Sequence, residues 1–126
     1  MMKKITSVLV VDAIEPVLPL WDAVGLQRVA EVPHGDKLGF VMLTGDGVEL
    51  MYQTRDSIQG DEPRALPLGP AAIFVEVASL EEITKRIPAG SNVIIPRRET
   101  FYNSTELIMK DAGGNVITFA QMKKAE

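Results

Sequence analysis

DGVELMYQ, at residues 46–53, is repeated in kind by GNVITFAQ, at residues 114–121 near the other end of the chain. Each stretch begins with a glycine-containing pair, Asp-Gly or Gly-Asn, that tolerates the positive φ angles of a tight hairpin turn. Apolar residues then alternate with other residues, which is typical of a strand with one face on a core. The repetition predicts two copies of one small unit, each closed by such a strand.

The segments before these two strands predict the same order of elements in both halves. Hydrophobic periodicity in the first half indicates strand, helix and three strands at residues 6–11, 13–24, 27–32, 37–43 and 48–53. The second half gives the same series at residues 71–77, 80–87, 92–96, 107–110 and 116–121. The predicted fold class is therefore α+β, with two βαβββ modules in tandem that form cupped mixed sheets.

Length and composition predict a single domain over residues 1–126. The chain is 46% hydrophobic and 24% charged, as expected for an ordinary globular protein that buries its own core. The first module covers about residues 4–54 and the second about residues 71–122. Between them, residues 55–70 include three of the eight prolines and are predicted to be a linker.

Charge and cysteine content narrow the functional classes. The net charge is −4 and the 13 lysines and arginines are scattered, so binding of nucleic acid is not expected. The chain has no cysteine, which excludes disulfides, thiolate ligands and a cysteine nucleophile. Asp12 and Glu15 interrupt the apolar N-terminal segment, so neither a signal peptide nor a membrane span is predicted. We expect a cytoplasmic protein.

Alternation along the strands predicts that each sheet has one apolar face, which packs its helix, and one face of mixed character. A mixed concave face is typical of a ligand pocket, although a half-exposed sheet surface or a subunit interface would have the same pattern. The candidate polar ligand-binding residues are Ser7, Glu49, Gln53, Glu76 and Thr118. The candidate apolar walls are Leu9, Phe40, Met42, Met51 and Phe74. Phe101 and Tyr102, in a polar loop, are candidates for a flap over the cleft.

Two βαβββ units in one short chain resemble the vicinal oxygen chelate superfamily, which includes glyoxalase I, extradiol dioxygenases, fosfomycin-resistance enzymes and bleomycin-resistance proteins. The local matches are VVD at residues 10–12, LWDAVGL at residues 20–26 and ELIMKDAGGNVI at residues 106–117. The last of these is similar to the closing hairpin of the superfamily. The resemblance covers nearly the whole chain and implies a homodimer. A cleft could form within one subunit or between two.

In metal-dependent members of that superfamily, four side chains point into the barrel from the first and last strand of each module. By position these fall on Ile5, Glu49, Ala72 and Thr118. A divalent ion needs several oxygen or nitrogen ligands at once, and this set offers one carboxylate and one neutral hydroxyl. The only histidine, His34, falls in a predicted turn. We therefore predict that the protein holds no metal and no other cofactor.

These expectations favour a small-molecule-binding protein of the glyoxalase/bleomycin-resistance type that sequesters an antibiotic or a cationic or aromatic metabolite. Two acids in an apolar cleft would favour a cationic guest, and burial would raise the pKa of such an acid. One alternative is a lyase, isomerase or dioxygenase-like enzyme of the same superfamily that uses Glu49 as a general base. The other is a non-catalytic dimeric scaffold.

Overall fold

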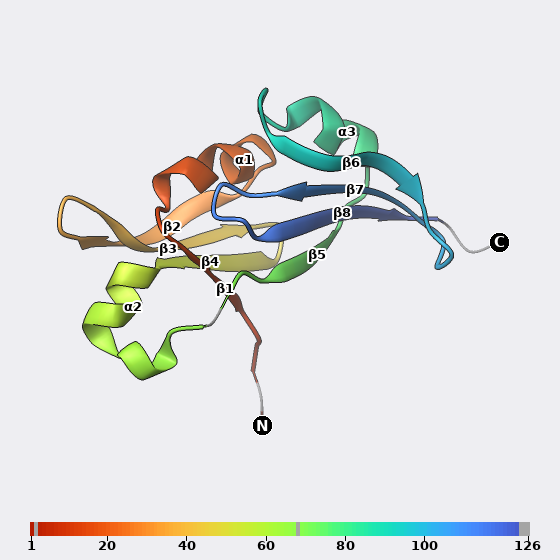
Figure 1. Cartoon of the computed structure of the whole chain (residues 1–126). Helices are drawn as coiled ribbons and strands as arrows, with labels where there is room; N and C mark the ends of the chain where they lie inside the picture. Colours follow the sequence, from red (N-terminus) through yellow and green to blue (C-terminus); the bar gives the residue numbers. More distant parts are fainter. Residues whose placement is uncertain (2, 68, 124–126) are drawn as a thin grey trace.

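The computed structural model describes residues 1, 3–67 and 69–123. The first module consists of β1 (Ser7–Val11), η1 (Glu15–Val17), α1 (Leu18–Ala23), β2 (Gln27–His34), β3 (Lys37–Gly45) and β4 (Val48–Thr54) (Figure 1). The second consists of β5 (Ala72–Glu76), α3 (Leu80–Arg86), β6 (Asn92–Glu99), β7 (Ser104–Lys110) and β8 (Val116–Met122). The predicted α+β class and tandem βαβββ modules are confirmed. In the described part of the chain, no helix is long and apolar enough to span a membrane.

Each module builds one four-stranded mixed sheet, and the two sheets have the same topology. The strand order is β1-β4-β3-β2 in the first sheet and β5-β8-β7-β6 in the second. The repeated strands β4 and β8 lie between the first and third strand of their module and pair in parallel with β1 and β5. The turns before them have the expected positive φ, +79° at Gly47 and +88° at Gly114.

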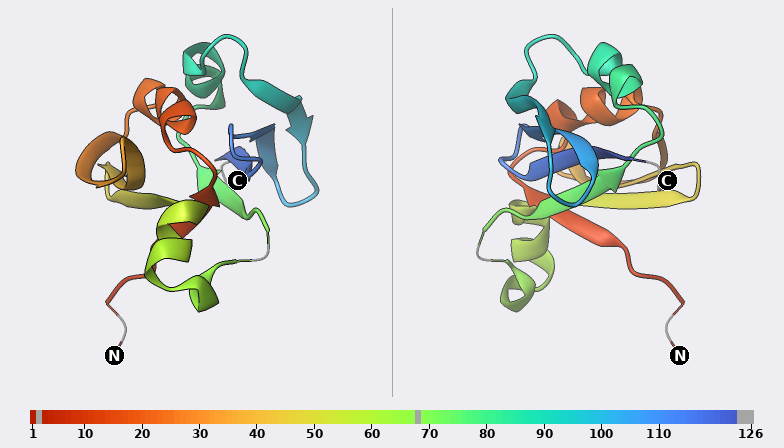
Figure 2. Two further views of the ribbon diagram at one scale, coloured as in Figure 1. Left: turned by 60° about the vertical axis from the view of Figure 1, so that its left-hand side comes forward. Right: turned by 90° about the vertical axis from the view of Figure 1, so that its right-hand side faces the viewer.

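The segment predicted as a linker contains two short helices, α2 (Arg55–Asp61) and η2 (Pro63–Ala65). The Thr54 side chain accepts a hydrogen bond from the Ser57 backbone N–H at 3.1 Å and caps α2. Ile58 is only 7% exposed, and Gln53 Nε2 donates to Ser57 Oγ at 3.1 Å, so α2 is tied to the end of β4. Figures 1 and 2 show α1 and α3 together on one side of the molecule and α2 on the other.

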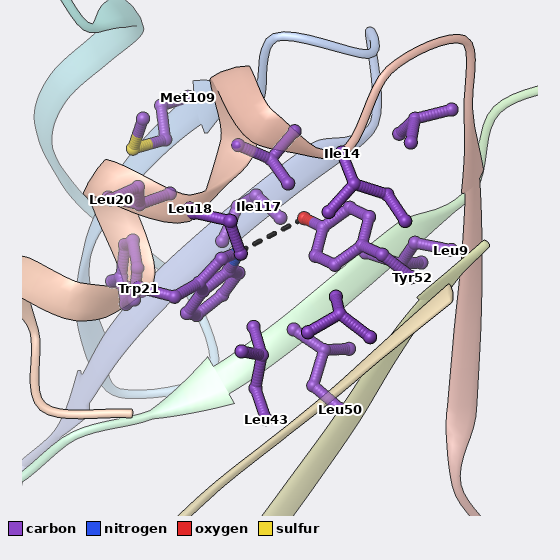
Figure 3. Close-up of a cluster of buried hydrophobic side chains, with 14 of the residues drawn as sticks. Leu9, Ile14, Leu18, Leu20, Trp21, Leu43, Leu50, Tyr52, Met109 and Ile117 are labelled. Atoms are coloured by element: carbon purple, nitrogen blue, oxygen red, sulfur yellow. Dashed lines mark hydrogen bonds between the residues drawn. The ribbon is translucent and has the colours of Figure 1, made fainter. Parts of the chain in front are cut away.

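One hydrophobic core joins the two modules. It contains the inward side chains of β1, β3 and β4, those of β7 and β8, and most of α1. The rings of Trp21 and Phe119 meet across the modules with centroids 6.0 Å apart. The helix-facing side of each sheet therefore packs into this common core, and the opposite side, here called the outer face, points away from it (Figure 3).

A buried polar network also crosses from one module to the other. Trp21 Nε1 donates to Tyr52 Oη at 3.0 Å, and Tyr52 Oη donates to Asp111 Oδ2 at 2.7 Å. Asp111 also accepts hydrogen bonds from the backbone N–H groups of Gly113 and Asn115. Burial, followed by the Asp111 charge, raises the pKa of the Tyr52 phenol, so Tyr52 stays a neutral donor.

Candidate functional site

Strand register brings four of the predicted binding residues together on the outer face of the first sheet. Met42 pairs with Met51, and Phe40 pairs with Gln53. Val8 and Val10 of β1 extend the same two rows. The helix α2 covers one end of this face and leaves a cavity of about 280 Å³ against Val8, Val10, Gln53 and Ile58. The predicted grouping of Phe40, Met42, Met51 and Gln53 is thus seen, but part of the face is already occupied.

Leu9 does not belong to this face. It pairs with Tyr52 in the parallel register, points into the common core and is 1% exposed, so the prediction that it walls a cleft is wrong. Ser7 lies on the same side of β1 as Leu9, near the strand's exposed end. The misassignment arises because Val8–Val11 is apolar on both faces, and alternation then gives no preference for either face.

The outer face of the second sheet carries Phe74 and Glu76 from β5 and Thr118 from β8. Phe74 pairs with Thr118, and its ring is 54% exposed. The next row reads Glu76, Ala120 and Glu106 across β5, β8 and β7. These three predicted residues therefore share one face, and the register adds Glu106, which the sequence analysis missed.

Glu106 is a fully buried carboxylate held by three side chains. Arg98 donates to Oε1 from Nε at 3.1 Å and from Nη2 at 2.9 Å, while Ser104 Oγ donates to Oε2 at 2.9 Å. Tyr102 Oη also donates to Oε2. Burial raises the pKa of Glu106, but the hydrogen bonds from Tyr102, Ser104 and Arg98 together outweigh burial, and the pKa is lowered.

This network also revises the expectation for the aromatic loop. The hydroxyl of Tyr102 is anchored on Glu106, whereas Phe101 is 97% exposed and meets the Tyr102 ring edge-on at 5.0 Å. Of these two residues, only Phe101 has the exposed side chain that a flap over a cleft would need. A glutamate in the middle of an otherwise apolar strand, STELIMK at residues 104–110, was the sequence signal for this cluster.

A cavity with a volume of about 620 Å³ lies between the modules. We call it the intermodule cavity. It is lined by Ser7, Trp21, Val24, Gly25, Leu26, Gly45, Asp46, Val48, Glu49, Leu50, residues 73–78, Ile83 and Phe119. Ser7, Glu49, Phe74 and Glu76 are the predicted binding residues that it brings together. Leu9, Phe40, Met42, Met51, Gln53, Tyr102 and Thr118 are not among its lining residues.

The intermodule cavity is acidic. Three of its lining residues, Asp46, Glu49 and Glu76, are acidic, and none of the described lining residues is a lysine, arginine or histidine. The Glu49 side chain is 18% exposed and forms an ion pair with Lys4 at 2.8 Å. The hydrogen bond from Lys4, and then that from Thr6, lowers the pKa of Glu49. The predicted rise in pKa is therefore wrong for Glu49, because the carboxylate is already paired.

The residues at the four expected metal positions do not fit a divalent ion. Ile5 precedes β1 and is 86% exposed, and neither it nor Ala72 has a side-chain donor atom. Thr118 lies beside Phe74, while Glu49 is engaged by Lys4 and Thr6. Among the residues that the structure describes, no three His, Cys, Asp or Glu side chains are grouped to hold a metal.

Comparison with known proteins identifies the fold. No family model and no curated protein sequence matches this chain. Solved structures show that the fold is that of the glyoxalase/bleomycin-resistance/dioxygenase proteins, as the sequence resemblance implied.

Three of the similar structures span nearly the whole chain. A glyoxalase/bleomycin resistance protein/dioxygenase from Nocardioides is 17% identical, with a TM-score of 0.70, and the match covers 100% of this chain and 89% of that one. TioX from Micromonospora sp. ML1 is 13% identical, with a TM-score of 0.72 and coverage of 97% and 100%. Lactoylglutathione lyase from Agrobacterium tumefaciens is 15% identical, with a TM-score of 0.74 and coverage of 94% and 92%. At these identities the likeness establishes the fold alone.

Proposed function

We propose that this protein binds a small cationic molecule with an apolar or aromatic body in the intermodule cavity. The observation that carries the proposal is the cavity itself, whose volume of about 620 Å³ lies within the usual range for small-molecule sites. Apolar residues from both modules line it, and three of its lining residues are acidic. This combination suits a guest that pairs an apolar surface with a positive charge.

An aromatic ring and an acidic side chain among the lining residues would both contribute to binding such a guest. Phe74 is a large, half-exposed aromatic ring, and the face of such a ring attracts a cation. The carboxylate of Glu76 is placed next but one on the same strand and the same face, so a guest stacked on Phe74 lies within reach of this charge. Attraction between opposite charges is stronger beside an apolar wall than in bulk water.

The charge requirement is tested with benzyltrimethylammonium and its neutral isostere, neopentylbenzene. We expect the cation to bind more tightly than the isostere, and Glu76→Gln to weaken cation binding by about fivefold in calorimetric titration, the size of effect expected for a solvent-accessible charge pair. The control is Asp36→Asn, which removes the same charge at the opposite end of β3 and is expected to change nothing. Equal binding of the isostere, or an equal loss in Asp36→Asn, would contradict the proposal.

Bleomycin serves as a second probe, because it is both cationic and aromatic and because one structural neighbour is a glyoxalase/bleomycin resistance protein/dioxygenase. Sequestration of an antibiotic predicts tight, stoichiometric binding of this probe without chemical change. Binding of the small cation alone would support a metabolite as the guest.

The enzyme alternative is less well supported by the geometry. A general base works best with a pKa near the working pH, and the hydrogen bonds from Lys4 and Thr6 instead lower the pKa of Glu49. Glu49 is therefore better suited to hold a positive charge than to abstract a proton. A scaffold role does not require a cavity with apolar walls and acidic lining residues, so the cavity favours the binding function over this alternative.

We also propose that two copies of the chain pair through their outer faces. Val8 on the first sheet and Met122 on the second are 44% and 39% exposed, and their burial against a second copy would stabilise the pair. Sedimentation velocity should give twice the mass of one chain, and Val8→Glu should shift the protein towards single chains. A wild-type protein that sediments as one chain at every concentration would contradict the pairing.

A further inference from the structure

The inner side of the second sheet is incompletely buried at its edge strand β5. The two sheets share one topology, and the inward side chains of the corresponding edge strand β1, Leu9 and Val11, are buried in the core. The inward side chains along β5 and just after it, Ile73, Val75 and Val77, are only partly buried and line the intermodule cavity. An apolar surface that the fold does not cover by itself is available to a guest.

Other elements around the cavity extend this apolar surface. They contribute aliphatic side chains from the residues just after α1, from the inward side of β4 and from α3, namely Val24, Leu26, Val48, Leu50 and Ile83. We call these five residues, together with the three of β5, the aliphatic surface. Among the described lining residues, Ser7 is the only polar one whose side chain a strand directs inward. The cavity therefore offers van der Waals contact on this side and little hydrogen bonding.

The two inward aromatic rings of the cavity are already engaged within the protein. Trp21 Nε1 donates to Tyr52 Oη at 3.0 Å, so the indole has no free hydrogen-bond donor (Figure 3). The Trp21 ring lies against that of Phe119, and both side chains are almost completely buried. A guest on this side of the cavity therefore contacts mainly aliphatic side chains.

The acidic lining residues leave the aliphatic surface uncharged. Strand register places the side chains of Glu49 and Glu76 on the outer faces of their sheets, and Asp46 lies in the exposed turn before β4. Burying a charge against hydrocarbon is costly. A cationic guest therefore keeps its charge near the surface of the protein and inserts only its apolar part between the modules.

We propose that the aliphatic surface of the intermodule cavity binds an alkyl chain, so that the guest is a single-chain alkylammonium amphiphile. This inference rests on the proposed function for the positive charge of the guest and adds the chemical class of its apolar body. Contact with hydrocarbon is not directional and grows with the area removed from water. The affinity of such a site therefore depends on the length of the chain.

The test is calorimetric titration of butyl-, hexyl- and octyltrimethylammonium, at concentrations below those at which they self-associate. Each methylene that leaves water is expected to tighten binding about fourfold, so the affinity should rise steadily from the butyl to the octyl ion. An affinity that is constant along the series, while benzyltrimethylammonium still binds, would overturn the alkyl-chain site and leave the cationic-guest function intact.

Val75→Thr tests the surface itself, because it introduces a hydroxyl with little change in shape. It should weaken binding of the octyl ion about fivefold, and Val77→Thr should do the same. The control is Val29→Thr on the edge strand β2, since Val29 is exposed and does not line the cavity. Circular dichroism checks that each variant is folded, and Val77→Thr carries the comparison if Val75→Thr is not. Equal weakening in Val29→Thr would overturn the inference.

Two further measurements separate this inference from the function on which it rests. Octanol has the chain without the charge, and binding as tight as that of the octyl ion would support the alkyl-chain site but contradict the cationic guest. If the octyl ion does not bind and Val75→Thr shifts sedimentation towards single chains, a second copy covers the aliphatic surface and the inference is overturned. Absence of binding of every cation and of octanol would overturn the proposed function and this inference together.

Discussion

Asp111→Ala is expected to lower the free energy of unfolding by about 4 kcal/mol, because the substitution strands several buried donors at once. Tyr52 Oη, 59 positions away in the sequence, loses its acceptor at 2.7 Å. The backbone N–H groups of Gly113 and Asn115 lose theirs at 3.0 and 2.8 Å. In the described part of the chain, no buried side-chain nitrogen or oxygen now lacks a partner. The variant would create such atoms at the junction between the modules.

Urea unfolding followed by circular dichroism measures this loss. Asp12→Ala is the matched control, since the Asp12 side chain is 89% exposed and its removal should change stability by no more than about 0.5 kcal/mol. Asp111→Asn keeps one acceptor oxygen for the backbone N–H groups of Gly113 and Asn115. Its loss of unfolding free energy should therefore lie between those of Asp111→Ala and Asp12→Ala. If Asp111→Ala were no more destabilised than Asp12→Ala, the network would not contribute to holding the modules together.

Glu106→Gln is expected to destabilise the protein by about 2 kcal/mol at neutral pH, because it replaces charge-assisted hydrogen bonds to a fully buried group with neutral ones. The effect should depend on pH in a defined direction. Burial raises the pKa of Glu106, but Tyr102, Ser104 and Arg98 together lower it below the unfolded value of about 4.3. The stabilisation from ionised Glu106 is therefore present above that value and is lost as the pH falls towards the folded pKa.

The difference in stability between the wild type and Glu106→Gln should accordingly be largest at neutral pH and should shrink as the pH falls below the unfolded value of about 4.3. Urea unfolding at several pH values measures it. Glu31→Gln is the control, because Glu31 is exposed on the edge strand β2. A stability difference that stayed constant from neutral to acidic pH would show that Glu106 acts through its shape and not through its charge.

The fold was accessible from the sequence because its signals are local. Asp46 and Gly47 adopt positive φ, as the turn prediction required, and the alternating residues after them do face the core and the outer side in turn. Local signals failed where they were ambiguous or weak. The run Val8–Val11 is apolar on both faces of the sheet, and Leu9 was therefore predicted to lie on the wrong face. Ile58 is the only large apolar residue of α2, so no periodicity indicated that helix.

The candidate site was only partly accessible for a different reason. Glu49, Phe74 and Glu76 were found because polar or aromatic residues stood at outward positions of predicted strands. Their gathering in one cavity with the end of α1 depends on how one module packs against the other, and no segment of the sequence carries that information. Glu106 was missed because its partners Arg98 and Tyr102 meet it only once the β6–β7 hairpin has formed.

By itself, the sequence determined two βαβββ modules, since turn chemistry and hydrophobic alternation act within a few residues of each other. The tertiary structure alone decided the intermodule cavity, the pairing of Lys4 with Glu49 across 45 positions, and the burial of Asp111 against Tyr52. These features join residues far apart in the chain, and their contacts follow from the packing of two finished modules around one core.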